Sequence, residues 1–339
     1  MLLFMSNFKL PQGFDIKEND AADFYSNFIA LEEQVGRAVI GQKDIVRLVA
    51  CAMVAGGNAL LEGLPGLGKT RMVKSFAKAL DLKFSRIQFT PDLMPSDVTG
   101  TDVFLKLPDG SSGFKFQRGP IFSNIVLADE INRATPKTQS ALLEAMQEAT
   151  VTVGGMSYNL PIPFFVLATQ NPIEMEGTYP LPEAQLDRFM FKLMVTSPQK
   201  DELLSILDIT TGTTHPEPSK VYDGSRILSM RELALQVPIA AAVSERCAEI
   251  VLKTHPEYKD APDIVKKYVR YGASPRGAQA LVSGAKIMAL LDKRYNVSFS
   301  DLNSLALPVL RHRIALNFDA IADGVDTSQI VNQIIGSEK

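Results

Sequence analysis

The eight residues GLPGLGKT, at positions 63–70, are the clearest indication of the fold of this chain. They match the pattern G-x-x-x-x-G-K-[ST], in which glycines let successive backbone N–H groups surround phosphate oxygens. An apolar run at 58–62 precedes them as a short buried strand, and apolar residues recur at helical spacing from Lys69 to Leu80. Strand, glycine turn and helix in this order predict a phosphate-binding loop at a helix N-terminus, where the helix dipole favours an anion.

Strands alternate with helices on both sides of this loop. Further buried strands are expected at 84–89, 125–128 and 164–168, which are short apolar runs bounded by polar residues. Helices are expected at about 20–39, 43–53 and 136–149. Alternation around a Gly-Gly turn within 151–160 indicates a β-hairpin. This pattern predicts an α/β domain of three layers around a parallel sheet.

Strand signals fade after about Val195. The stretch at 210–224, rich in Thr, Pro and Gly, is expected to be a connector or an exposed insertion. Helices are expected at 243–254, 276–294 and 300–314, the last of which Pro308 could kink. We therefore expect two domains: an α/β domain over 1–197, including the N-terminal helix and the hairpin, and a small all-α domain over 198–339.

Composition excludes several classes of protein. The chain has 339 residues, 46% of them hydrophobic and 22% charged, as in an ordinary globular protein. The 35 Lys and Arg against 38 Asp and Glu give a net charge of −3 and no overall attraction to nucleic acid. Two cysteines exclude a disulfide scaffold, and three scattered histidines make a zinc site improbable. Without a membrane-length apolar run or a signal-peptide pattern at residues 1–5, a cytoplasmic protein is expected.

Two adjacent carboxylates end the expected strand at 125–128, in the sequence IVLADE. Adjacent residues of an extended chain point in different directions, so the two groups can divide the work. Asp129 can hold Mg²⁺ together with the Thr70 hydroxyl, and Glu130 can activate a water against a γ-phosphate that Lys69 reaches. The less specific interpretation is a strand that meets a solvated loop.

A third polar strand end comes from the run FFVLATQN at 164–171. If this strand neighbours the one that carries the carboxylates, Asn171 lies beside Glu130 and can hydrogen-bond the attacking water or the γ-phosphate. Otherwise an asparagine before Pro172 is a turn residue.

Together these motifs resemble those of the AAA+ ATPases, and three further segments sharpen the resemblance: VIGQ at 39–42, LPEAQLDRF at 181–189 and GASPRG at 272–277. In that family the first lies near the adenine, the second carries an arginine finger and the third is the sensor-2 motif. The motifs follow the family's order across the whole chain. The resemblance therefore implies that Arg188 is the finger and Arg276 the sensor-2 residue.

Within the AAA+ proteins, the chain resembles the MoxR family. The segments that carry this resemblance are ADEINR at 128–133, TQSALLEAMQE at 138–148, FQRGPIF at 116–122, ATQNP at 168–172 and the hairpin at 151–160. Leu64 departs from relatives that often have proline there, outside the groups that do chemistry. The implied fold is a three-layer P-loop AAA+ domain with a parallel sheet, followed by a small all-α lid domain.

The resemblance also implies a set of functional residues. Those that act in hydrolysis are Glu130, Asn171, Arg188 and Arg276. Those that hold ATP are Ile40, Gly41, Gln42, Gly63, Pro65, Gly66, Leu67, Gly68, Lys69, Thr70 and Asp129, with Thr70 and Asp129 as ligands of Mg²⁺. Less specific interpretations remain open for both arginines: Arg188 could pair with Asp187 or Glu183 on a helix surface, and Arg276 could be an ordinary cation at a helix start.

The implied activity is ATP hydrolysis in a hexameric ring, with ATP at subunit interfaces. MoxR proteins are regarded as chaperones that mature or activate protein complexes, often with a von Willebrand factor A domain partner. Two alternatives stay open, namely a ring motor that remodels nucleic acid and a nucleotide-gated binding module that hydrolyses slowly. The net charge of −3 disfavours the first, and the presence of Glu130 disfavours the second.

Overall fold

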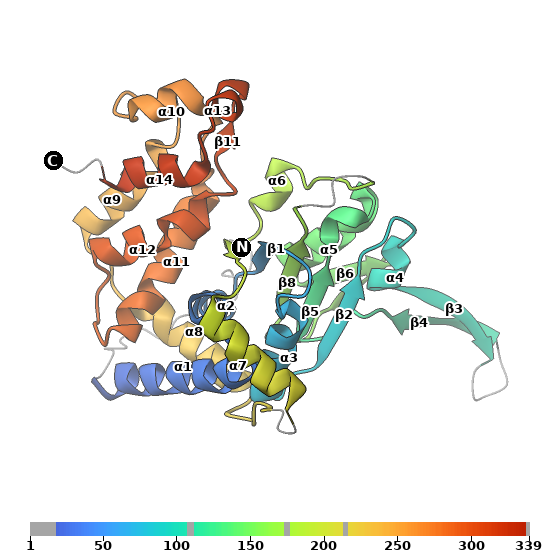
Figure 1. Ribbon diagram of the computed structural model, residues 1–339. Helices are drawn as coiled ribbons and strands as arrows, with labels where there is room; N and C mark the ends of the chain where they lie inside the picture. Colours follow the sequence, from blue (N-terminus) through green and yellow to red (C-terminus); the bar gives the residue numbers. More distant parts are fainter. Residues whose placement is uncertain (1–17, 107–111, 173–176, 213–215, 337–339) are drawn as a thin grey trace.

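The computed structural model describes residues 18–106, 112–172, 177–212 and 216–336. Its centre is a parallel sheet of five strands in the order β2-β5-β8-β1-β9 (Figure 1). These strands are β1 (Ala59–Gly63), β2 (Phe84–Gln88), β5 (Ile125–Asp129), β8 (Phe165–Gln170) and β9 (Phe191–Val195). The expected parallel α/β sheet is confirmed, and all three polar strand ends lie at the carboxyl edge of neighbouring strands.

Helices cover both faces of the sheet. Alternate residues of β1 point to opposite faces, so Leu61 joins the hydrophobic cluster of one layer and Leu60 that of the other. The first layer contains α1 (Glu18–Ala38), α2 (Lys43–Ala55) and α3 (Lys69–Ala79), and the second contains α4 (Pro95–Thr99), the short 3-10 helix η2 (Ile131–Arg133) and α5 (Pro136–Glu148). The α1 helix forms as expected, because Phe24, Phe28 and Leu31 recur at helical spacing and are buried.

Two hairpins extend the α/β body. The expected one consists of β6 (Thr150–Val153) and β7 (Met156–Asn159). The other, β3 (Gly100–Lys106) with β4 (Ser112–Arg118), was not predicted, and it projects away from the body in Figure 1. Its strands lack a buried apolar face, and Phe104 and Phe114 form an exposed aromatic pair, so periodicity gave little signal there.

The C-terminal part is mainly helical, as expected. Its helices are α7 (Lys200–Thr211), α8 (Gly224–Gln236), α9 (Ala241–Leu252), α10 (Asp263–Tyr268), α11 (Pro275–Leu291), α12 (Phe299–Leu310), α13 (Phe318–Ala322) and α14 (Thr327–Gly336). It is not all helix, because β10 (Val269–Tyr271) and β11 (Ala315–Leu316) form a short antiparallel ribbon. Such brief strands are too short for an alternating pattern to be recognised.

The stretch expected to be a connector or an insertion is partly structured. Its first residues belong to α7, and the Val221 N–H donates to the Ala79 carbonyl at the end of α3, 2.8 Å away. Only part of it is therefore exposed, because the chain returns to the first layer before α8 begins. Residues 1–5 and His215, which entered the sequence argument, lie outside the described residues.

One hydrophobic cluster joins the sheet to the C-terminal helices. It includes Leu61 of β1, Phe76 of α3, Phe28 of α1 and Leu281 of α11. The expected boundary at 197/198 falls between β9 and α7, but the core continues across it, so this division remains a prediction.

Candidate nucleotide-binding site

The loop between β1 and α3 has the conformation that a phosphate cradle requires. Gly66 and Gly68 have φ angles of 85° and 77°, in the left-handed region where glycine has no Cβ penalty. A Cβ added at either position would meet no heavy atom within 4 Å, so both glycines face open space. The first backbone N–H groups of a helix have no partner within the helix, so the loop that leads into α3 suits a bound phosphate chain.

Lys69 and Thr70 lie in the first turn of α3. The Lys69 Nζ donates to the carbonyl of Gly63, 2.6 Å away, which holds the ammonium group at the mouth of the loop. Burial lowers the pKa of Lys69, while Asp129 and Glu130 act in the opposite direction. A half-buried ammonium beside two carboxylates is suited to contact phosphate oxygens.

The segment expected near the adenine touches this loop. The Gln42 Nε2 donates to the carbonyl of Leu67 at 2.8 Å, so the residue before α2 is tied to the phosphate loop. The Gln42 Oε1 is buried, and no described residue provides a donor for it. Gln42 thus has a free acceptor beside the loop, and a purine amino group could satisfy it.

Asp129 ends β5 and has partners for both carboxylate oxygens. The Thr169 Oγ1 donates to its Oδ1 at 2.6 Å, and Arg86 Nη2 donates to its Oδ2 at 2.6 Å. A carboxylate and the hydroxyl of Thr70 are hard oxygen donors of the kind that Mg²⁺ takes together with nucleotide phosphates. The donor set fits magnesium, although a metal at Asp129 would compete with the Arg86 guanidinium for one oxygen.

Glu130 lies in a different environment from Asp129. Its backbone has φ 56° and ψ 50°, a left-handed conformation that turns the chain after the strand. Its Oε2 accepts hydrogen bonds from the Gln88 Nε2 and the Arg133 Nη1, each at 2.9 Å. The two neighbouring carboxylates therefore have separate hydrogen-bond partners. This arrangement suits two different roles, metal binding for Asp129 and proton acceptance for Glu130.

Asn171 follows β8, and β8 pairs directly with β5, as the sequence argument required. Asn171 is buried at the same edge of the sheet as Glu130. The link between the two strands comes from Thr169, whose Oγ1 accepts from the Glu130 N–H at 2.8 Å while it donates to Asp129.

Sequence reasoning missed Arg86, Gln88, Arg133 and Thr169. The signal for the first two was present, because two polar residues at alternate positions of the β2 sequence FSRIQ share one face. Only the pairing of β2 with β5 shows that this face meets Asp129 and Glu130.

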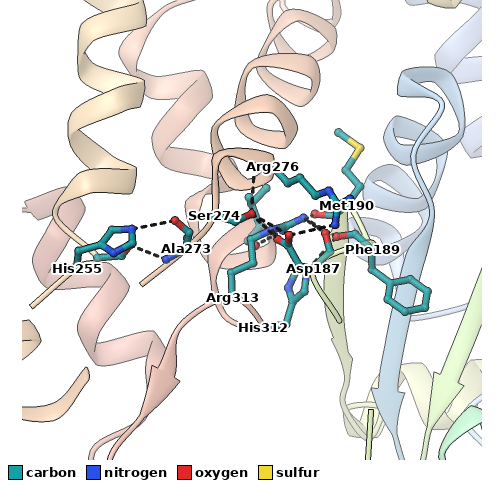
Figure 2. Close-up of polar contacts among 11 residues, drawn as sticks. Asp187, Phe189, Met190, His255, Ala273, Ser274, Arg276, His312 and Arg313 are labelled. Carbon is teal, nitrogen blue, oxygen red and sulfur yellow. Dashed lines mark hydrogen bonds and ion pairs between the residues drawn. The ribbon is translucent and has the colours of Figure 1, made fainter. Parts of the chain in front are cut away.

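The two arginines implied by the resemblance have different partners. Arg188 follows the short helix α6 (Glu183–Leu186), and its Nη1 donates to the carbonyl of Leu143 on α5 at 2.7 Å. Arg276, near the start of α11, is 45% exposed, and its Nη1 lies 3.5 Å from the Asp187 Oδ2. Ser274 donates from Oγ to the same carboxylate at 2.8 Å, so Asp187 connects the lid to the segment of Arg188 (Figure 2).

The sheet order, the phosphate loop on β1, the carboxylate pair on β5 and the helical C-terminal part together define a P-loop ATPase of the AAA class. Residues 58–191 match the ATPase family associated with various cellular activities, and residues 262–334 match the AAA lid domain.

Relatives identify the family within this class. The chain is 40% identical to Chaperone MoxR1 of Mycobacterium tuberculosis, over 89% of this chain and 79% of the relative. It is 29% identical to Protein MoxR of Methylorubrum extorquens, over 84% and 86% of the two chains. The chain belongs to the MoxR family of AAA ATPases.

Two further similarities extend over almost the full chain. YeaC of Bacillus subtilis, an uncharacterized protein, is 44% identical over 91% of this chain and 92% of its own length. A crystal structure from Cytophaga hutchinsonii superposes with a TM-score of 0.88 at 40% identity, covering 95% of this chain and 97% of that one.

Among the described residues, no single helix has the length and apolar character needed to cross a membrane; α8 and α9 meet that criterion only as a pair bent by 102°.

Proposed function

We propose that this protein is a magnesium-dependent ATPase that assembles into a hexameric ring and uses hydrolysis to remodel, mature or activate partner protein complexes. The observation that carries the proposal is the placement of a phosphate loop on β1 beside the carboxylate pair of β5, with β8 between them. The relative named Chaperone MoxR1 supports the chaperone-like role.

In the binding step, the loop from Gly63 to Gly68 surrounds the phosphates, and Lys69 moves from the Gly63 carbonyl to the β- and γ-phosphates. Thr70 and Asp129 would hold Mg²⁺, which would neutralise phosphate charge. Ile40, Gly41 and Gln42 lie beside the adenine, where the free Gln42 Oε1 accepts a hydrogen bond.

In the hydrolytic step, Glu130 accepts a proton from the attacking water. Gln88 and Arg133 both donate to the Oε2 of this carboxylate, which orients the group. Asn171, at the end of the adjacent strand, orients the water or the γ-phosphate.

The positions of the arginines support the proposed ring. Arg276 lies beside Asp187, the residue that precedes Arg188, and the charged neighbours of Lys69 are Asp129, Glu130 and Glu62 instead. Arg188 is therefore suited to a site on a neighbouring subunit, where a guanidinium stabilises charge on the transferred phosphoryl group.

Mixing two inactive variants tests the ring. Arg188→Ala should bind ATP but hydrolyse it about 10³–10⁵-fold more slowly, and Lys69→Ala should not bind ATP. If the finger acts across an interface, the mixture regains activity wherever an intact loop meets an intact finger. Co-assembled variants that show no activity above either one alone would contradict the ring-interface assignment.

The partner class is tested separately. Glu130→Gln with ATP should retain client complexes in a pull-down, and a von Willebrand factor A domain protein from a neighbouring gene should raise the ATPase rate of the unmodified chain. Stimulation by DNA, in place of protein, would favour a nucleic-acid motor. A slow rate with no response to any partner would favour a nucleotide-gated binding module.

A further inference from the structure

Arg313 is an almost fully buried arginine of the lid, with 2% of its side chain exposed. It follows α12, and it reaches into the α/β domain to the segment just before β9. Its Nε donates to the Asp187 Oδ1 at 2.9 Å, and its Nη2 donates to the carbonyls of Asp187 at 3.2 Å and Phe189 at 2.7 Å (Figure 2). Its Nη1 donates to the Met190 carbonyl at 3.2 Å.

The atoms held by Arg313 flank Arg188 on both sides in the sequence. Asp187 precedes the expected finger, and Phe189 and Met190 follow it. The neighbouring His312 adds a ring nitrogen 3.0 Å from the Phe189 carbonyl. One short segment of the lid therefore fixes the backbone around the finger residue, although the two segments lie 126 positions apart.

The contact is suited to a planar guanidinium. Arginine presents five N–H donors in a rigid fork, whereas lysine has one ammonium group that cannot reach a carboxylate and several carbonyls at once. Burial lowers the pKa of Arg313 to about 10, with Asp187 acting in the opposite direction, so the side chain remains charged at neutral pH.

Stability alone is a weak reason for this arrangement, because well-packed apolar residues often replace a buried ion pair at no cost. An apolar replacement would, however, lose the directional hydrogen bonds that the Arg313 guanidinium donates to residues 187–190. Asp187 also accepts from Ser274 and lies beside Arg276, so the same carboxylate connects the start of α11 to the finger segment.

We propose that Arg313 is a positioning residue for the arginine finger. It transmits the position of the lid, which carries Arg276, to Arg188, which serves the nucleotide of the neighbouring subunit. This inference rests on the ring described under the proposed function. Its consequence is that a lid displaced by nucleotide in one subunit shifts the finger that the same subunit offers to the next.

The test uses Arg313→Lys, which keeps the charge and removes the fork. ATP binding should stay close to that of the unmodified chain, because the phosphate loop is untouched. Hydrolysis should fall about 10²-fold, the size of effect expected when a reacting group is misplaced by about 1 Å. A mixture of Arg313→Lys with Lys69→Ala should regain activity, because the first variant supplies intact loops and the second supplies intact fingers.

Arg294→Lys is the matched control. Arg294 is also a lid arginine held by a carboxylate, with its Nη2 2.6 Å from the Asp301 Oδ1, but its hydrogen bonds within the described part of the chain go to Asp292, Asn296 and Asp301 and not to residues 187–190. Its replacement should lower the melting temperature without changing hydrolysis per folded subunit. Asp187→Asn supplies a second variant for the proposed contact, with the same expected loss and the same recovery on mixing, if Arg313→Lys folds poorly.

The outcomes separate this inference from the proposed function. Hydrolysis by Arg313→Lys at the original rate overturns the inference. The inference is also overturned if mixing Arg313→Lys with Lys69→Ala restores no hydrolysis while mixing Arg188→Ala with Lys69→Ala does. Arg313 would then act in the nucleotide site of its own subunit. If Arg188→Ala and Lys69→Ala co-assemble and the mixture regains no hydrolysis, the ring-interface assignment itself is contradicted. A double variant Arg188→Ala/Arg313→Lys should be no slower than Arg188→Ala, and further loss counts against action through the finger.

Discussion

At the residue scale, Glu130 combines a left-handed backbone with a carboxylate that Gln88 and Arg133 both hold. We expect Glu130→Gln to bind ATP and retain it, because the substitution preserves shape and removes the base. Hydrolysis should fall about 10²–10⁴-fold, the usual contribution of general base catalysis. Phosphate release and nucleotide retained after gel filtration measure the two effects. Glu144→Gln, at an exposed position of α5, should change neither, and near-normal turnover of Glu130→Gln would remove Glu130 from this role.

His312 makes the stability of the fold depend on pH. Burial, with Arg313 as the next cause, lowers the pKa of His312 well below its ordinary value, so the folded chain holds the ring neutral. The unfolded chain binds a proton below about pH 6.5, and the folded chain does not, so stability is lost as the pH falls below that value, by at most about 1.4 kcal/mol per pH unit.

The variant His312→Gln isolates the contribution of His312 to the pH dependence of stability. The glutamine side chain can still donate a hydrogen bond to the Phe189 carbonyl, and it does not titrate. Urea denaturation at pH 7.5 and 5.5 should show a smaller loss of unfolding free energy in the variant than in the unmodified chain. Equal losses in both chains would show that other groups cause the pH dependence.

At the element scale, the phosphate loop depends on backbone conformations that a Cβ disfavours. Gly66→Ala should lower the free energy of unfolding by about 1–2 kcal/mol, the cost of a left-handed alanine. It should also weaken ATP binding at least about tenfold, equivalent to about 1.4 kcal/mol, because the methyl group enters the open space of the cradle.

Gly155 is the matched control for that experiment. It lies in the β6–β7 turn with φ 80°, and a Cβ there also meets no atom within 4 Å. Gly155→Ala should lower the free energy of unfolding by a similar amount in urea denaturation. Its affinity for ATP, measured by titration, should be normal. Equal weakening of ATP binding by both substitutions would mean that strain, not occupation of the cradle, causes the effect.

At the scale of the whole molecule, α1 joins the two parts of the chain in one core. Phe28 is fully buried in the cluster that contains residues of both the sheet and α11. We expect Phe28→Ala to lower the free energy of unfolding by about 3–5 kcal/mol, the cost of a large cavity. Because the cluster is shared, calorimetry should show a single transition moved to lower temperature. Phe318→Ala, at an 88% exposed position, should change stability by no more than about 0.5 kcal/mol.

Local sequence determined much of this protein. The phosphate loop, the sheet strands β1, β2, β5 and β8, the β6–β7 hairpin and the carboxylate pair were predicted, because each depends on residues close together in the chain, whereas β9 was not. Glycines set the loop conformation, and apolar spacing sets which face of an element is buried. The β3–β4 hairpin was not predicted, because its strands have no alternating pattern of buried apolar residues.

Tertiary structure alone decided which distant side chains meet. Arg86 and Asp129 are 43 positions apart and join only because β2 pairs with β5, and Arg313 meets Asp187 across 126 positions because the lid docks beside β9. Strand order and lid docking depend on the packing free energy of the whole core, which is a sum over many weak contacts. No local pattern records that sum, so the sequence identified the chemical groups and the fold determined which of them act on one another.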